Sequence, residues 1–242
     1  MKKVKVYAIV RCLNEEKNIG SLLERLKAVG VIPLVVDDGS TDRTREIAEK
    51  KGVFVIEHQQ NMGSGFAMKT GYIFAMKKFD DDSIVLVVDG DGQHDPSDIP
   101  KFIAEISANK ADYIIGERFS SHPRKLGMPA LNYVFGKLLN FVASIVTRIH
   151  VKDSTCCFTA IEVSCLRNLR LLLPSRGAET QEMILECAKN RLRVAFVPIR
   201  LIYRKNSRVS KMRLLKSLLT VYWRAVVRKP YYTSMARAHG LL

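Results

Sequence analysis

The chain has 242 residues, 47% of them hydrophobic, which is enough for one large α/β domain or one domain with a small appendage. Its five cysteines show no zinc-type spacing, and the apolar run at the N-terminus is too short for a signal peptide, so we predict a reducing compartment without disulfides. The net charge of +15 is uneven: residues 1–117 carry −3 and residues 118–242 carry +18. We therefore expect the second half to meet an anionic partner, namely a membrane surface, a phosphate or a nucleic acid.

Short β-rich runs alternate with helical patterns through the first half. Strands are predicted at 4–10, 31–36, 53–56, 84–88 and 112–115. The first helix is expected to be capped by Asn14 and to stop at Gly30, and the second to be capped by Ser40 or Thr41. Two further helices are predicted up to about position 78 and over 97–108. Strands that alternate with helices predict an α/β fold with a mostly parallel, doubly wound sheet covered on both faces.

The stretch IVLVVDGDGQHDP, at 84–96, places carboxylates directly after a buried strand. Asp89 and Asp91 lie two residues apart and can point at one ion, with Gly90 allowing a tight turn. Gln93 can add a carbonyl oxygen or hold a metal-bound water, whereas His94 is interpreted as a turn residue or an outer contact. Oxygen ligands favour Mg²⁺ or Mn²⁺. These ions typically keep several waters and take their remaining ligands from substrate phosphates. A polar turn without a metal is the alternative for an isolated D-G-D, but the buried strand before it favours the metal.

Polar loops also follow the second and third predicted strands. After the second strand, one of Asp37 and Asp38 is expected to cap the next helix with Ser40, and the other to bind a ribose or a nucleobase. The loop after the third strand contains Gly63 and Gly65, for which flexibility and a backbone approach to a ligand are equally good interpretations. It is not a Walker A loop, because no G-K-[ST] follows. Since such loops meet at one edge of a doubly wound sheet, they predict a single ligand site.

Four segments in this order carry a family resemblance: VVDDGSTDRTREIAE, NMGSGFAMKTG, VVDGDGQHDPSDIP and IIGERF. Together they resemble the family-2 inverting glycosyltransferases with a GT-A fold, in particular the branch of dolichol-phosphate mannose synthases and polyprenyl-phosphate glycosyltransferases. The similarity is dense from position 4 to 119 and continues to about 216. It implies a metal-dependent enzyme that moves a sugar, with inversion, from a nucleoside-diphosphate sugar to a polyprenyl or dolichyl phosphate.

The resemblance assigns residues to the sugar donor. It implies that Asp38 and Asp37 hold the nucleoside, that Glu15 lies beside the base, and that Asp89, Asp91 and Gln93 bind the metal on the diphosphate. The full set implied for nucleotide-sugar binding is Arg11, Leu13, Glu15, Asp37, Asp38, Gly63, Lys69, Asp89 and Gly90. Arg11 and Leu13 stand where many members have proline and tyrosine, which leaves the base open. UDP is favoured slightly over GDP, because residues 130–161 are more similar to the UDP-hexose members.

The resemblance also assigns the catalytic and acceptor residues. The implied catalytic set is Asp91, Arg118, Gln181 and Glu182, and the implied acceptor-phosphate set is Arg118, Arg208, Ser210 and Lys211. Arg118 matches the arginine of the family's G-S-R-Y motif, and Gln181 and Glu182 lie at its acidic helix start with the spacing shifted by one. Thr159 replaces the arginine of the family's D-x-T-S-G-F-R-A motif, and Arg208 replaces a glycine. Acceptor handling therefore departs further from the family than donor binding does.

The charge distribution favours a phosphate acceptor. A phosphomonoester is already anionic at neutral pH, so cations that position it matter more than a base. A hydroxyl acceptor would need a general base, and only five acidic residues follow position 117, against 23 lysines and arginines. The open alternatives are transfer to a polysaccharide or protein hydroxyl, a sugar nucleotidyltransferase, for which the Gly-rich first loop is missing, and a basic nucleic-acid-binding protein, for which no known motif is found.

Two basic, apolar segments predict contact with a membrane. Residues 131–149 are almost long enough to span a bilayer, but their polar members lie along one stripe: Lys137, Asn140, Ser144, Thr147 and Arg148. A helix over 129–149 that lies in the interface and one that packs on the sheet are equally weighted hypotheses. We expect a catalytic domain over 1–208, with a nucleotide-sugar half (1–117) and an acceptor half (118–208), and a basic amphipathic helix and tail over 209–242. The predicted enzyme is peripheral on the cytoplasmic face of the membrane.

Overall fold

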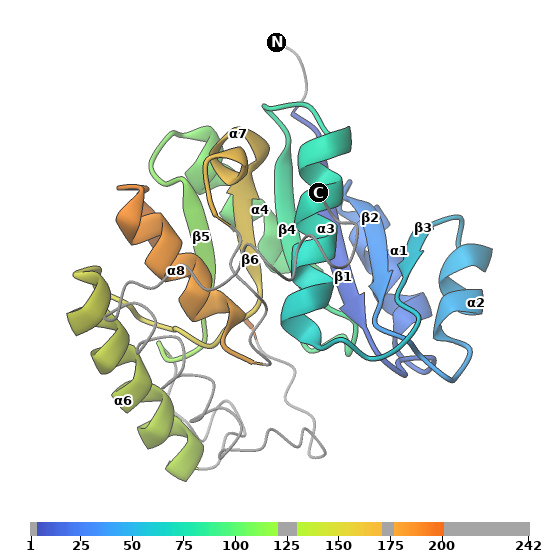
Figure 1. The fold of residues 1–242 in the computed structure, drawn as a ribbon, viewed down its shortest axis with the longest axis horizontal. Coiled ribbons are helices and arrows are strands. Elements are labelled where there is room, and N and C mark those ends of the chain that lie inside the picture. The colour runs from blue at the N-terminus through green and yellow to red at the C-terminus, as the bar shows by residue number, and fades with distance from the viewer. Residues whose placement is uncertain (1–3, 121–129, 171–176, 201–242) are drawn as a thin grey trace, which may run out of the picture.

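The computed structural model describes residues 4–120, 130–170 and 177–200 (Figure 1). Within them, seven strands form one mixed sheet in the order β3-β2-β1-β4-β6-β5-β7. The strands are β1 (Val6–Cys12), β2 (Ile32–Asp37), β3 (Phe54–Glu57), β4 (Ile84–Asp89), β5 (Tyr113–Glu117), β6 (Thr159–Glu162) and β7 (Val194–Pro198). Six of them run in one direction, and β6 is antiparallel to its neighbours β4 and β5. The predicted α/β class and mostly parallel sheet are confirmed.

Helices cover both faces of this sheet, as predicted. They are α1 (Ile19–Ala28), α2 (Thr44–Lys50), α3 (Ser64–Lys78), α4 (Ile99–Ser107), preceded by the 3₁₀ turn η1 (Pro96–Asp98), α6 (Ala130–Thr147), α7 (Val163–Arg167) and α8 (Glu179–Lys189). In Figure 1, α3 and α8 lie over the near face and α4 lies behind the sheet. The five strands and four helices predicted for the first half all occur, with their ends shifted by a few residues.

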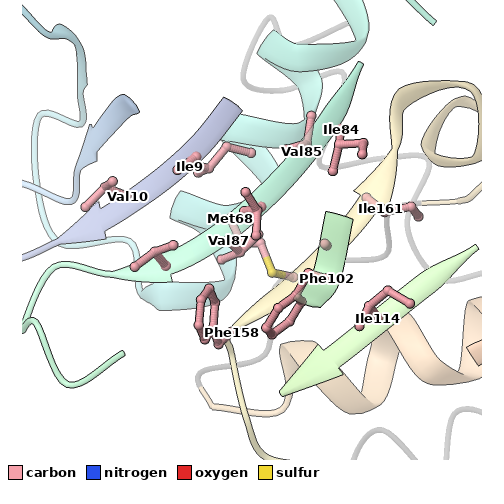
Figure 2. Close-up of a cluster of buried hydrophobic side chains, with 14 of the residues drawn as sticks. Ile9, Val10, Met68, Ile84, Val85, Val87, Phe102, Ile114, Phe158 and Ile161 are labelled. Carbon is pink, nitrogen blue, oxygen red and sulfur yellow. The ribbon is translucent and has the colours of Figure 1, made fainter. Parts of the chain in front are cut away.

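The core is centred on β1 and β4, the two middle strands of the parallel part. Every residue of the apolar run 84–88 is at most 1% exposed, which confirms the prediction of a fully buried strand. On one face Ile9 and Val87 pack towards α3, and on the other Phe102 of α4 lies 4.6 Å from Phe158, ring centroid to ring centroid (Figure 2). Each such buried side chain contributes about 1.5–3 kcal/mol to folding.

Both predicted helix caps are wrong, because the side chains concerned bind a neighbouring loop. Asn14 adopts a left-handed backbone (φ 57°), well before α1, and its Oδ1 accepts a hydrogen bond from Thr41 N at 2.8 Å. Asn14 N in turn donates to Ser40 Oγ at 2.9 Å. The first turn of α2 is bound instead by Asp42, whose carboxylate accepts from Thr44 N at 2.9 Å. The loops after β1 and β2 are thus joined to each other.

Only the middle of the predicted polar stripe of α6 is turned to the protein, whereas Lys137 and Arg148 at its two ends are exposed. Asn140 is 4% exposed; it donates to Lys152 O at 2.5 Å and accepts from Ser154 N at 2.8 Å. Ser144 Oγ accepts from Val151 N at 2.9 Å. The exposed face of α6 also carries large apolar residues: Val134, Leu138, Phe141, Val142, Ile145 and Val146. Among the described helices none has the length and apolarity needed to cross a membrane. The predicted tail 209–242 and the boundary at 208 lie outside the described residues.

Gly71 marks the closest approach of α3 to β1, and it provides a test of this packing. A Cβ at Gly71 would lie 2.4 Å from Ile9 Cγ2, so Gly71→Ala should lower the free energy of unfolding by about 1–3 kcal/mol in urea titrations. Gly20→Ala in α1 is the matched control, because its nearest atom is at 3.3 Å and alanine favours a helix. Equal effects of the two substitutions would contradict the packing described here.

Candidate active site at the carboxyl edge of the sheet

The loops after β1, β2 and β4 meet at one edge of the sheet, as the sequence predicts. Asp38 N donates to Cys12 O at 2.9 Å, and Gly90 N donates to Arg11 O at 2.7 Å. His58 N, just after β3, donates to Asp37 O at 2.9 Å. These backbone hydrogen bonds extend the ladder past the strand ends and fix the polar loops relative to one another. The candidate site residues of four strands are thereby brought together.

Asp37 and Asp38 have different roles in the structure. Both carboxylate oxygens of Asp38 are used inside the protein: Oδ1 accepts from Met62 N and contacts His58 Nδ1, and Oδ2 accepts from Gly63 N at 2.7 Å. Asp37 Oδ1 accepts from Ser40 N at 2.9 Å, whereas Asp37 Oδ2 is buried without a hydrogen-bond partner among the described residues. Asp38 therefore shapes the loop before α3, and Asp37 retains an acceptor.

The acidic loop after β4 turns over residues 90–92, so the turn predicted at Gly90 is present, and Gly92 adopts the left-handed backbone. Gly92 has a φ of 70°, whereas Gly90 is needed because a Cβ there would lie 2.7 Å from Cys12 Cβ. Asp91 accepts from Gln93 twice, from the backbone N at 2.9 Å and from Nε2 at 2.7 Å. Burial and the neighbouring charge of Asp89 raise the pKa of Asp91. This carboxylate has no cationic partner among the described residues.

His94 supports the acidic loop from below, in agreement with its predicted role as an outer contact. Its side chain is buried and stacks on Phe158 with ring centroids 4.9 Å apart. Its Nδ1 accepts a hydrogen bond from Asp89 N at 3.4 Å, so the ring holds the end of β4 in place. Burial lowers the pKa of His94, and the imidazole is held neutral.

Arg11 is a buried cation at the end of β1. Its guanidinium pairs with Asp89, donates to Glu179 Oε1 at 2.8 Å through Nη1, and reaches Ser64 O at 3.1 Å. Although burial opposes the charge, these carboxylates raise the pKa of Arg11 well above its ordinary value. Burial likewise opposes the charge of Asp89, but Arg11 lowers the pKa of that carboxyl. With 4% of its side chain exposed, Arg11 does not offer the direct nucleotide contact that the resemblance implied.

Arg118 is also held by a carboxylate. It donates through Nε and Nη2 to the two oxygens of Asp153, at 2.7 and 2.8 Å, and through Nη2 to Thr155 Oγ1 at 2.6 Å. The side chain of Asp153 is fully buried, and that of Arg118 is 18% exposed. Burial opposes the charge, but Asp153 raises the pKa of Arg118. Arg118 therefore presents a fixed cation whose orientation is determined by the loop before β6.

Helix α8 brings the second half of the chain to the same region. Its residues 179–187 are all buried, and Gln181 has neither amide atom hydrogen-bonded among the described residues. Glu182 is 9% exposed and lies close enough to Lys69 of α3 to act on its pKa, which burial lowers and Glu182 raises. The sequence offers Glu179 only as a candidate base for a hydroxyl acceptor, and its pairing with Arg11 was not predicted. Its only signal was an arginine inside the buried β1, which requires a carboxylate nearby.

The remaining predicted residues lie at the rim or outside the described residues. Leu13 is 36% exposed, and Glu15 accepts from Asn18 Nδ2 at 2.6 Å in the loop before α1. Arg208, Ser210 and Lys211 lie outside the described residues.

The loop after β4 fits a hard divalent ion whose shell is completed by another molecule. Among the described residues no group of three or more His, Cys, Asp or Glu side chains is arranged to hold a metal. Asp91 provides a partly buried carboxylate that lacks a counter-charge among the described residues, and Gln93 and the second oxygen of Asp89 add oxygen donors. Mg²⁺ and Mn²⁺ accept such a partial set and take the rest of their ligands from water and phosphate.

Comparison with known proteins decides the family. The sequence profile of glycosyl transferase family 2 matches residues 7–170. The chain belongs to this family. The glycosyltransferase is 31% identical over 221 residues to the UDP-N-acetylglucosamine–dolichyl-phosphate N-acetylglucosaminyltransferase of Methanococcus voltae, covering 84% of this chain and 87% of the relative. It is 29% identical over 180 residues to the dodecaprenyl-phosphate galacturonate synthase of Rhizobium johnstonii, covering 68% of this chain and 49% of the relative.

Solved structures confirm the GT-A-like fold of the glycosyltransferase. Glucosyl-3-phosphoglycerate synthase from Mycobacterium tuberculosis, in complex with phosphoglyceric acid, superimposes with a TM-score of 0.67 at 19% identity, covering 91% of this chain and 80% of that one. The same enzyme has been solved with Mn²⁺, UDP and glucosyl-3-phosphoglycerate. Family and fold together favour an enzyme over the nucleic-acid-binding and nucleotidyltransferase alternatives.

Neutralising Asp91 and neutralising Asp153 should have opposite effects on the stability of the protein. Because the pKa of Asp91 is raised in the fold, its charge costs stability above that pKa, and the cost vanishes as pH falls through it. Asp91→Asn should therefore unfold no earlier than the wild type at pH 7.5, with any gain shrinking towards about pH 4. Asp153→Asn, the control, should lose about 3–5 kcal/mol, because it leaves Arg118 buried without its partner. Thermal unfolding at several pH values measures both, and a marked loss in Asp91→Asn would contradict the assignment.

Proposed function

We propose that the protein transfers a sugar, with inversion, from a UDP-sugar to a polyprenyl or dolichyl phosphate, using Mg²⁺ or Mn²⁺, as a peripheral enzyme on the cytoplasmic face of a membrane. The observation that carries this proposal is the carboxylate of Asp91, just after β4, which among the described residues is bound only by the neutral donors of Gln93 and has no counter-charge. A carboxylate that has no counter-charge at this edge of the sheet favours the binding of a cation. A cation bound there in turn favours an anionic substrate.

Donor binding is proposed for the loops after β2 and β4. Asp37 keeps a buried acceptor oxygen for the nucleoside, whereas both oxygens of Asp38 are already used. Asp91, Gln93 and the second oxygen of Asp89 would hold the divalent ion. When bound, such an ion supplies positive charge that stabilises the departing diphosphate. UDP is proposed because the relative from M. voltae is named for a UDP-sugar, and because the fold neighbour was solved with UDP.

A phosphate acceptor agrees with the charges of the second half. A phosphate attacks as an anion and needs positioning, which the fixed cation Arg118 and the half-buried Lys69 can supply. A hydroxyl acceptor needs a general base, but Glu179 is paired with Arg11 and Glu182 is nearly inaccessible. The relatives from M. voltae and R. johnstonii are named for dolichyl and dodecaprenyl phosphate, which supports the same class of acceptor.

Attachment to a membrane is proposed through the outward apolar face of α6. Val134, Phe141 and Ile145 on this face are each more than 60% exposed, which is costly in water and favourable at a lipid interface. The sequence 201–242 adds ten lysines and arginines and no acidic residue, which favours an anionic leaflet.

Lipid extraction tests the reaction. The enzyme is incubated with Mn²⁺, a polyprenyl phosphate and labelled UDP-N-acetylglucosamine, UDP-glucose or GDP-mannose, and the organic phase is counted. We expect label from a UDP-sugar, lost on chelation and reduced at least about 100-fold by Asp91→Ala, because transition-state charge is no longer offset. Label from none of the three donors in the organic phase would favour a hydroxyl acceptor.

Vesicle flotation tests the membrane contact. Ile145→Glu places a charge in the outward face of α6 and should reduce binding to vesicles that contain anionic lipid by about tenfold or more, since the charge must be desolvated. Ile32→Glu is the matched control, because Ile32 is also exposed (49%) but lies at the start of β2. Equal binding of both variants and the wild type would exclude α6 as the contact.

A further inference from the structure

Arg11 is a charge placed inside the middle of the sheet, where a guanidinium requires strong compensation. It lies opposite Asp89 in the pairing of β1 with β4, and on the same face of β1 as Ile9, which packs against α3. Its partners come from distant parts of the chain: Asp89 ends β4, and Glu179 begins α8. Only Asp89 of the three is partly exposed, with 34% of its side chain accessible. The network therefore reaches the site through Asp89 alone.

The two carboxylates after β4 differ in their counter-charges. Asp89 gives its Oδ1 to the guanidinium of Arg11, whereas Asp91, within the part of the chain that the structure describes, accepts only from the neutral backbone and amide nitrogens of Gln93. A carboxylate that already neutralises an arginine attracts a second cation less, and the arginine itself repels that cation. The two aspartates of D-G-D are therefore unequal, although the sequence presents them as a symmetric pair.

We propose that Arg11 divides the acidic pair, so that Asp89 serves as the counter-ion of a positioning arginine and Asp91 is the principal protein ligand of the divalent ion. This inference rests on the proposed function and deepens it. Arg11 acts through Asp89 and Glu179, joining the end of β4 to the start of α8, and does not itself touch the substrate. An ion held by one full carboxylate binds weakly to the free enzyme and enters together with the diphosphate.

Binding of Mn²⁺ to the nucleotide-free enzyme, followed by the EPR signal of the free ion, tests this division. Asp91→Asn should weaken binding at least about 30-fold, whereas Asp89→Asn should weaken it less than about threefold. The double variant Arg11→Met/Glu179→Gln removes a cation and an anion together, so the net charge is unchanged and only the partly exposed Asp89 loses its partner. It should bind Mn²⁺ about tenfold more tightly, because Asp89 is released, and adding Asp89→Asn should abolish that gain.

A second ion pair near the site provides the matched control. Arg25 and Asp95 form an arginine–aspartate pair at 2.8 Å, four residues beyond Asp91, and Arg25→Met/Asp95→Asn should leave Mn²⁺ binding within about twofold. Thermal unfolding verifies that each variant is folded.

The outcomes separate the inference from the proposed function. Equal losses in Asp89→Asn and Asp91→Asn would overturn the division while leaving the metal site in place. An unchanged affinity in Arg11→Met/Glu179→Gln would show that Arg11 does not restrain Asp89, and would overturn it as well. No loss in Asp91→Asn would place the ion elsewhere and overturn both the inference and the proposed metal site, whereas sugar transfer is decided independently by lipid extraction.

Discussion

A buried guanidinium between two carboxylates constrains the whole carboxyl edge of the sheet. Arg11 can remain charged inside β1 only because Asp89 and Glu179 reach it from β4 and α8, 78 and 168 residues away in the chain. Removing one partner of such a buried network typically costs about 3–5 kcal/mol, so the three elements must come together for any of them to be stable there. The same requirement fixes the end of β4, and therefore the position at which the acidic loop begins.

The carboxylates of the site are distinguished by what satisfies them. The carboxylate of Asp38 accepts hydrogen bonds from the loop before α3. The carboxylate of Asp153 pairs with Arg118, and one oxygen of Asp89 pairs with Arg11. Among the described residues Asp91 is bound only by the neutral donors of Gln93, and burial beside the charge of Asp89 raises its pKa. Most acidic residues at this edge thus build the scaffold, and few are available for a ligand. Chemistry is concentrated where the protein has not already supplied the counter-charge.

Local sequence patterns were enough to predict the strands and helices. The roles of individual side chains could not be predicted where they depend on contacts between distant loops. The apolar run before Asp89 and the helical spacing after Gly63 are properties of single segments, so the strands, the helices and the ligand edge followed from them. The cap assigned to Asn14 failed because its side chain binds a loop some 27 residues away. No spacing rule could pair Arg11 with Glu179, or tell Asp37 from Asp38. The stripe on α6 was found, but its direction depends on polar partners at 150–154 that only the fold supplies.

Helix α8 contacts both Arg11, beside the proposed donor site, and helix α6, the proposed membrane contact. Its first residue, Glu179, holds Arg11, and the helix also contacts α6, whose exposed face carries large apolar side chains. Figure 1 shows α6 beside α8, with α3 on the other side of α8. Because residues 179–187 are buried throughout, α8 cannot move independently of the helices that enclose it. A lipid surface at α6 and a diphosphate at Asp91 would therefore be held by one rigid connection, which keeps an acceptor headgroup at a fixed distance from the donor.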